Sequence, residues 1–186
     1  MNRRLLWTGL LCVLSLWLTA VMAAGMAAAI VFTHLPPLEP TAAVFEGLAQ
    51  PFQARLIAGI ATDPAFRIAD GVQLVCLPLS LVLFFLLEAK AIRRENASPK
   101  LVHVRVALIL LAGGLVIGRK LTIGLQMDAH LQTERAAAAA GNFDLAISAQ
   151  NAFLELHPTA AHLWEASTVV VLAIFVLHVW AVVKDA

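Results

Sequence analysis

The sequence predicts an all-α protein, an integral membrane bundle of four transmembrane helices with a helical outer cap. Of its 186 residues, 61% are hydrophobic and only 13% are charged. Soluble domains average about 45–50% apolar and about 25% charged residues, so this composition is typical of a membrane protein. Four apolar runs are also long enough to cross about 30 Å of hydrocarbon as helices. We therefore expect a single four-helix transmembrane domain over residues 1–186.

The apolar runs alternate with two longer connections. In chain order, the helices and the two outer segments cover about residues 5–33, 34–70 (outer), 71–89, 102–126, 127–158 (outer) and 159–183. The first helix follows Arg3 and Arg4 and has features of a secretory signal. Its uncharged run continues past Ile30, which is too long for the apolar region of a signal, so we expect a retained helix.

Both outer segments are expected to contain helices. Three prolines between residues 36 and 40 favour an extended start, followed by one or two short helices along the surface. In the second segment, the third helix continues without a breaker until Gly141 ends it. A further helix over residues 143–157 is then expected to end at Pro158, before the last membrane helix begins.

The positions of the charges predict the orientation in the membrane. Arg3, Arg4 and Lys184 flank the first and last helices, and five further Lys or Arg residues lie between residues 90 and 105. The two outer segments hold eight acidic residues but only three arginines. Because cytoplasmic loops carry the basic excess, we expect both termini in the cytoplasm and the protein in a cell membrane, namely a bacterial inner membrane. The net charge of only +1 argues against a nucleic-acid partner.

Polar side chains interrupt the third and fourth helices at a similar depth. Arg119 and Glu165 are both short of the outer boundary, so they are candidates for an ion pair. Helical spacing places His130 on the same face as Arg119. The intramembrane cluster comprises Arg119, Glu165, Gln126, His162 and Asp70. It predicts a polar pocket that opens outward, although the interpretation we favour is that the cations snorkel and the acids lie among headgroups.

Six histidines raise the alternative of a haem protein, because membrane four-helix bundles hold haem between imidazoles of facing helices. His34 and His162 are candidates for an outer pair, and His103 and His178 for an inner pair, around haem b. His103 lies at the extreme edge of its helix and His34 directly before the proline-rich connection. Histidines at helix ends are commonly interfacial, so we predict no cofactor in the first instance.

Enzyme and metal chemistry have no motif in this sequence. It contains no phosphate-binding glycine loop, nucleophile elbow or pair of catalytic carboxylates. His130 and Glu134 share a helix face, but no zinc-binding motif surrounds them. The only two cysteines, Cys12 and Cys76, lie in apolar runs and form no disulfide framework.

Small residues on the third helix predict close helix packing. Gly114 and Gly118 are four positions apart, a spacing that lets helix backbones approach each other in lipid. We expect this contact to form within the bundle rather than between two copies.

Two short motifs resemble a four-helix membrane family of unknown function that includes transmembrane protein 205 and bacterial relatives. The run from Phe32 to Pro36 is similar to the Phe, two residues, Leu-Pro ending of helix one in that family. The run from Phe153 to His157 resembles its Phe-to-His motif before the last helix. Where the family often has Ser and Asn after this histidine, the chain has Ala160 and Trp164. The resemblance implies the four-helix architecture and carries no settled activity.

These observations favour a non-enzymatic multi-pass membrane protein that acts as an accessory or structural subunit and partners other membrane proteins. The alternative, from a different class, is a small haem- or metal-binding membrane protein for redox chemistry or transport that uses the histidines named above.

Overall fold

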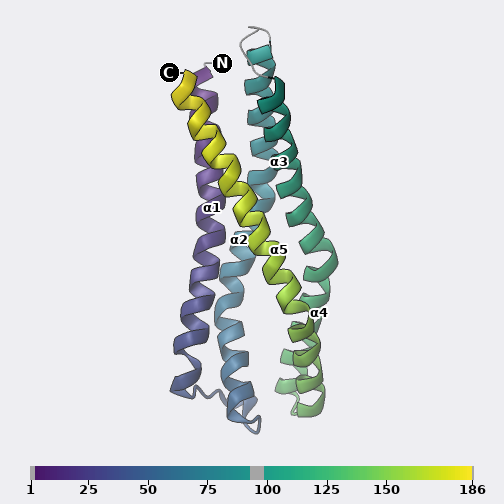
Figure 1. Ribbon diagram of the computed structural model, residues 1–186. Coiled ribbons are helices and arrows are strands. Elements are labelled where there is room, and N and C mark those ends of the chain that lie inside the picture. Colours follow the sequence, from purple (N-terminus) through teal and green to yellow (C-terminus); the bar gives the residue numbers. More distant parts are fainter. Residues whose placement is uncertain (1–2, 93–98, 186) are drawn as a thin grey trace. The chain divides into compact units, whose positions relative to one another are not determined.

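The computed structural model describes residues 3–92 and 99–185, and every regular element in these ranges is a helix (Figure 1). Four helices in the described residues are long and apolar enough to cross a membrane. They correspond in order to the four predicted spans. The all-α class and the four apolar helices are therefore confirmed.

The first, second and last α-helices are longer than the predicted spans, whereas the third is shorter and continues through a π-helix into the fourth. The elements are α1 (Arg3–His34), the short 3-10 helices η1 (Pro36–Leu38) and η2 (Ala43–Phe45), α2 (Gln50–Ile92), α3 (Pro99–Gly118), the π-helix η3 (Arg119–Gly124), α4 (Leu125–Ala139) and α5 (Phe143–Asp185). Both α2 and α5 contain 43 residues. At about 1.5 Å per residue, each is roughly 65 Å long, about twice the thickness of the hydrocarbon layer.

Pro158 does not end a helix, so that prediction is wrong. Helix α5 runs through it without interruption. Proline inside a helix removes one backbone hydrogen bond and costs about 3 kcal/mol. Helix α5 has buried residues on both sides of Pro158, over 146–150 and 167–181, and their packing offsets that local cost. The predicted end at Gly141 is confirmed, because Gly141 has a φ of +74° and follows α4. The amides of Gly141 and Asn142 donate to Ala138 and Ala137 in a Schellman motif.

The proline-rich connection is less extended than predicted. Pro36 and Pro37 begin the 3-10 turn η1, since the φ of proline suits the first position of a helical turn. Glu39 ends this turn in the left-handed region, with a φ of 49°. The expected short helices of this segment are η1 and η2, and from Gln50 onward the residues belong to α2.

A π-helical turn separates α3 from α4. It covers Arg119–Gly124, and the helix otherwise continues to Ala139 as predicted. A π-helix pairs residue i with i+5, so its wider turn displaces later residues around the axis relative to earlier ones. The prediction that Arg119 and His130 share one face assumed α-helical spacing throughout this segment, and it stays a prediction.

The chain divides into two compact units. Unit 1 comprises Met1–Met22, Ile68–Ile117 and Trp164–Ala186, and unit 2 comprises Ala23–Arg67 and Gly118–Leu163. In unit 1, each of α1, α2, α3 and α5 contributes one buried face to the core. Representative core residues are Leu10, Leu14, Trp17, Phe84, Ile109, Val116, Val171 and Ile174. They recur at intervals of three and four residues, the period of a helix face.

The start of α1 and the end of α5 lie at the same end of unit 1 (Figure 1). This is the arrangement required when a chain crosses a membrane an even number of times. Arg93 and Arg94, which carry part of the predicted basic connection, lie outside the described residues. Unit 2 has a smaller core, built from Phe45, Leu56, Ala137, Ala138 and Ala146.

Candidate functional site

Unit 1 contains a set of polar side chains inside its apolar core. The buried members are Gln73, Ser80, Glu88, Arg105, Ser167 and His178. Polar groups inside a membrane bundle are costly and commonly mark functional positions. This set is therefore the candidate site of the protein, and it differs from the cluster that the sequence predicted.

Glu88 and Arg105 form a buried ion pair between α2 and α3. Arg105 Nη1 lies 3.0 Å from Glu88 Oε1, and the side chains of Arg105 and Glu88 are only 6% and 9% exposed, respectively. The guanidinium carbon of Arg105 also lies 5.8 Å from the centre of the Trp7 ring on α1, within the range of a cation–π contact. Three helices are thus connected at one level of unit 1.

His178 on α5 faces the same interior. Its Nδ1 lies 2.8 Å from the carbonyl oxygen of Ile174, and because a carbonyl only accepts, Nδ1 carries the proton. In the neutral ring Nε2 then presents a lone pair, and this buried atom has no hydrogen-bond partner among the described residues. The ring makes edge contacts with Trp7 and Phe84, with centroid distances of 5.7 and 5.8 Å.

Two further polar groups lie on the inward face of α2. Gln73 and Ser80 are both fully buried, and neither side chain has a hydrogen-bond partner within the described part of the chain. They are seven residues apart and share a face with Phe84. Ser167 on α5 differs, because its hydroxyl donates to the carbonyl of Trp164 over 2.8 Å.

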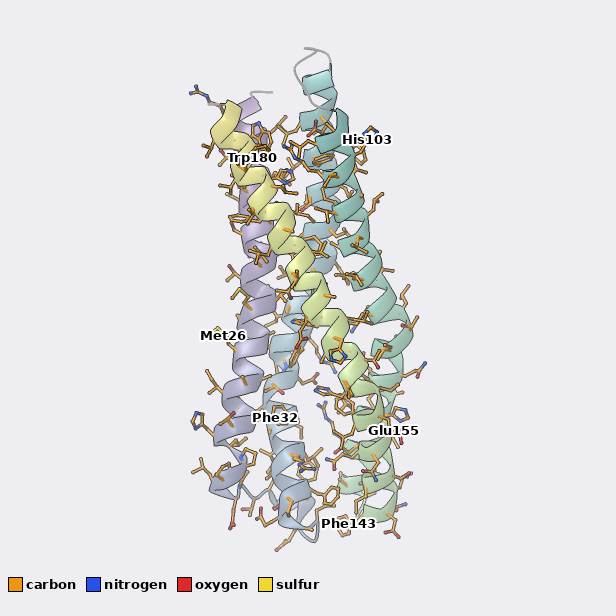
Figure 2. All side chains as sticks on the ribbon, viewed as in Figure 1. Met26, Phe32, His103, Phe143, Glu155 and Trp180 are labelled. Atoms are coloured by element: carbon orange, nitrogen blue, oxygen red, sulfur yellow. The ribbon has the colours of Figure 1, made fainter. Side chains whose placement is uncertain are left out.

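The predicted inner histidine pair is not brought together in the interior. His178 is fully buried, whereas His103 is exposed on the outer side of α3 (Figure 2). Trp180 is likewise exposed on α5. Of the predicted polar cluster, unit 1 holds Asp70, which is half-buried, and Glu165, which is exposed.

Unit 2 holds the other predicted residues. His34, His162 and Gln126 are exposed, and Arg119 is half-buried. Among the described residues, no group of three or more His, Cys, Asp or Glu side chains is placed to hold a metal ion.

The polar contacts of unit 2 include ion pairs and a buried carboxylate. Asp63 on α2 accepts from Arg67 over 3.2 Å and from Arg135 of α4 over 3.1 Å. Gln150 Nε2 donates to the buried Glu134 over 2.9 Å. These contacts connect α2 with α4 and α4 with α5.

The interior set of unit 1 had a signal in the sequence. Gln73, Ser80 and Glu88 recur on one helix face together with apolar core positions, a pattern that a solvent-facing or lipid-facing stripe lacks. No family model, curated protein or solved structure matches the chain.

Proposed function

We propose that this chain is a non-enzymatic, multi-pass membrane protein that acts as an accessory or structural subunit, and that a helix of a partner membrane protein docks on α3 at Gly114. The observation that supports this proposal is the free space beside the backbone of Gly114. Gly114 is exposed, and a Cβ added to it would meet no atom within 4 Å. A Cβ added to Gly118, the last residue of α3, would also meet no atom within 4 Å.

The adjacent glycine has a different environment. A Cβ on Gly113 would lie 3.0 Å from Leu77 Cδ1, so Gly113 is the position where α3 packs against α2. The expectation that Gly114 packs within the bundle is therefore wrong. Its side of α3 also presents Leu110, Leu111 and Ile117, all exposed. A glycine among apolar side chains lets a second helix approach closely in lipid.

Site-specific photocrosslinking tests this docking face. A photoreactive residue at Leu111 is expected to give a defined adduct with one membrane protein in intact cells. Gly114→Ile is expected to abolish the adduct, because the added side chain blocks close approach. Gly25→Ile is the matched control, since Gly25 on α1 is also exposed with open space around it. An adduct that survives Gly114→Ile, or no adduct at all, contradicts the proposal.

The proposed location is a bacterial inner membrane, with both termini in the cytoplasm. The support is the basic excess at the ends of the chain and the acidic excess in the outer segments. In a background of Cys12→Ala and Cys76→Ala, Asp144→Cys should react with an impermeant maleimide on intact spheroplasts. Lys184→Cys should react only after permeabilisation. The reverse pattern contradicts this orientation.

We also propose a relation to the four-helix family that includes transmembrane protein 205, on the Phe32–Pro36 and Phe153–His157 motifs. In this chain, the rings of Phe153 and His157 lie one helical turn apart, with centroids separated by 5.5 Å. An experimental structure of a family member tests the relation. The corresponding Phe and His should share a helix face before the last span, and a different helix topology contradicts the relation.

Of the four histidines in the haem alternative, only His178 is buried in the described structure. The buried Nε2 of His178 has a lone pair and no partner among the described residues, as an axial ligand requires. The other candidates, His34, His103 and His162, are exposed. A Soret band in the purified protein that His178→Phe abolishes would favour haem b binding over the subunit function.

A further inference from the structure

Apart from the Glu88–Arg105 ion pair, three buried side chains of unit 1 have polar atoms that the described chain does not satisfy. They are both amide atoms of Gln73, the hydroxyl of Ser80 and Nε2 of His178. All three side chains are fully buried, with 0% of their surface exposed. Inside a membrane bundle such groups are strongly unfavourable unless something else supplies their hydrogen bonds.

These groups lie along one interior line rather than at scattered points. Gln73, Ser80 and Phe84 share the inward face of α2, and the His178 ring contacts Phe84 with a centroid distance of 5.8 Å. Ser80 is therefore about one helical turn from the level of His178. Gln73 lies seven residues, or about 10 Å of helix, beyond Ser80.

The hydrogen-bonding capacities of the three groups identify the ligand class. Nε2 of His178 only accepts, the Gln73 carboxamide donates through its nitrogen and accepts through its oxygen, and the Ser80 hydroxyl does both. A cation would satisfy only the acceptors, and an anion only the donors. Water both donates and accepts, and it is small enough for sites inside a packed bundle.

We propose that the interior of unit 1 binds water molecules, one near Ser80 and Nε2 of His178 and another at the carboxamide of Gln73. The bound water donates to Nε2 and exchanges hydrogen bonds with the serine hydroxyl and the amide. The bundle is thereby hydrated from within, although each of its helices presents apolar side chains to the outside.

The sign of a stability change tests the Ser80 site. If water is bound, Ser80→Ala removes one of its partners and lowers Tm in detergent. If the site is dry, the same change removes an unsatisfied hydroxyl and raises Tm. Ser167→Ala is the matched control, because Ser167 is a buried helical serine of the same unit whose hydroxyl bonds its own backbone. We expect Ser80→Ala to lower Tm at least as much as Ser167→Ala does, and a Tm above that control overturns the proposal.

Radiolytic hydroxyl labelling provides a second measurement, since bound water generates radicals beside the nearest reactive side chain. Cys76 is buried on α2 between Gln73 and Ser80 in the sequence, whereas Cys12 is exposed on α1. We expect faster oxidation of Cys76 than of Cys12 in the detergent-solubilised chain, and a slower rate at Cys76 in the Ser80→Ala variant. Oxidation of Cys76 no faster than that of Cys12 overturns the proposal. A Soret band abolished by His178→Phe also overturns it, because iron would then occupy Nε2.

Discussion

Arg105 donates from Nη1 to Glu88 Oε1 over 3.0 Å, and this bond joins α3 to α2 among apolar side chains. Each side chain is less than a tenth exposed, at 6% for Arg105 and 9% for Glu88. The pair therefore differs from the exposed ion pairs common on protein surfaces, since removal of one partner leaves the other charge buried.

Glu88→Ala and Arg105→Ala are each expected to destabilise the protein by about 3–5 kcal/mol, because either change leaves an uncompensated buried charge. The double variant Glu88→Met with Arg105→Met should lose much less, since neither charge remains. Equilibrium unfolding in a mixed detergent gives all three values. Single variants with wild-type stability would show that the pair is hydrated.

The pair of Arg119 and Glu165 remains a prediction from the sequence. Arg119→Ala and Glu165→Ala should each lower Tm in detergent, and the double variant should lose less than the sum of the two. Glu165 is exposed, so the expected loss is smaller than for Glu88. Full stability of both single variants together with strict additivity would mean that Arg119 only snorkels.

Gly113 and Gly114 should respond differently to the same substitution. Gly114→Ala is expected to stabilise by up to about 1 kcal/mol, because alanine is the better helix former and open space surrounds the site. Gly113→Ala places a methyl group 3.0 Å from Leu77 Cδ1, and overpacking offsets that gain. Thermal unfolding should therefore rank Gly114→Ala above Gly113→Ala. The opposite order would mean that Leu77 moves aside freely.

The two arginines at Asp63 should contribute unequally to unit 2. Arg135 joins α4 to α2 and its side chain is 27% exposed, so Arg135→Ala is expected to cost about 1 kcal/mol. Arg67 lies on the same helix as Asp63 with a 64% exposed side chain, so Arg67→Ala should cost less. The difference should shrink at high salt, where exposed charges are screened. Equal losses at all salt concentrations would argue against a specific Arg135 contact.

The fold was largely predictable because membrane helices are recognised by length and apolar content. The helix end at Gly141 was predictable because glycine readily adopts the positive φ that ends many helices. The predicted helix end at Pro158 was wrong because the local cost of a proline was not compared with the packing of the whole helix α5. The π-helical turn at Arg119–Gly124 has only a weak signal in the sequence, since Thr122, Ile123 and Gly124 have low helix propensity but no proline marks a break.

The interior site was less predictable. Arg105 belongs to a basic cluster that orients the chain, and a count of charges does not show which one turns inward. His178 resembles any histidine near a helix end until its ring is placed against Phe84 and Trp7. Contacts between helices determine whether Arg105 and His178 lie in the interior. The spacing of residues along one helix shows only which of them share a helix face.

The aromatic composition makes the two units spectroscopically distinct. The chain has four tryptophans and no tyrosine, and Trp7, Trp17, Trp164 and Trp180 all belong to unit 1. Intrinsic tryptophan emission therefore reports on unit 1 alone, while far-ultraviolet circular dichroism follows the helices of both units. Unfolding curves from these two signals, recorded on the unmodified chain, separate if the units melt independently and coincide if they unfold together.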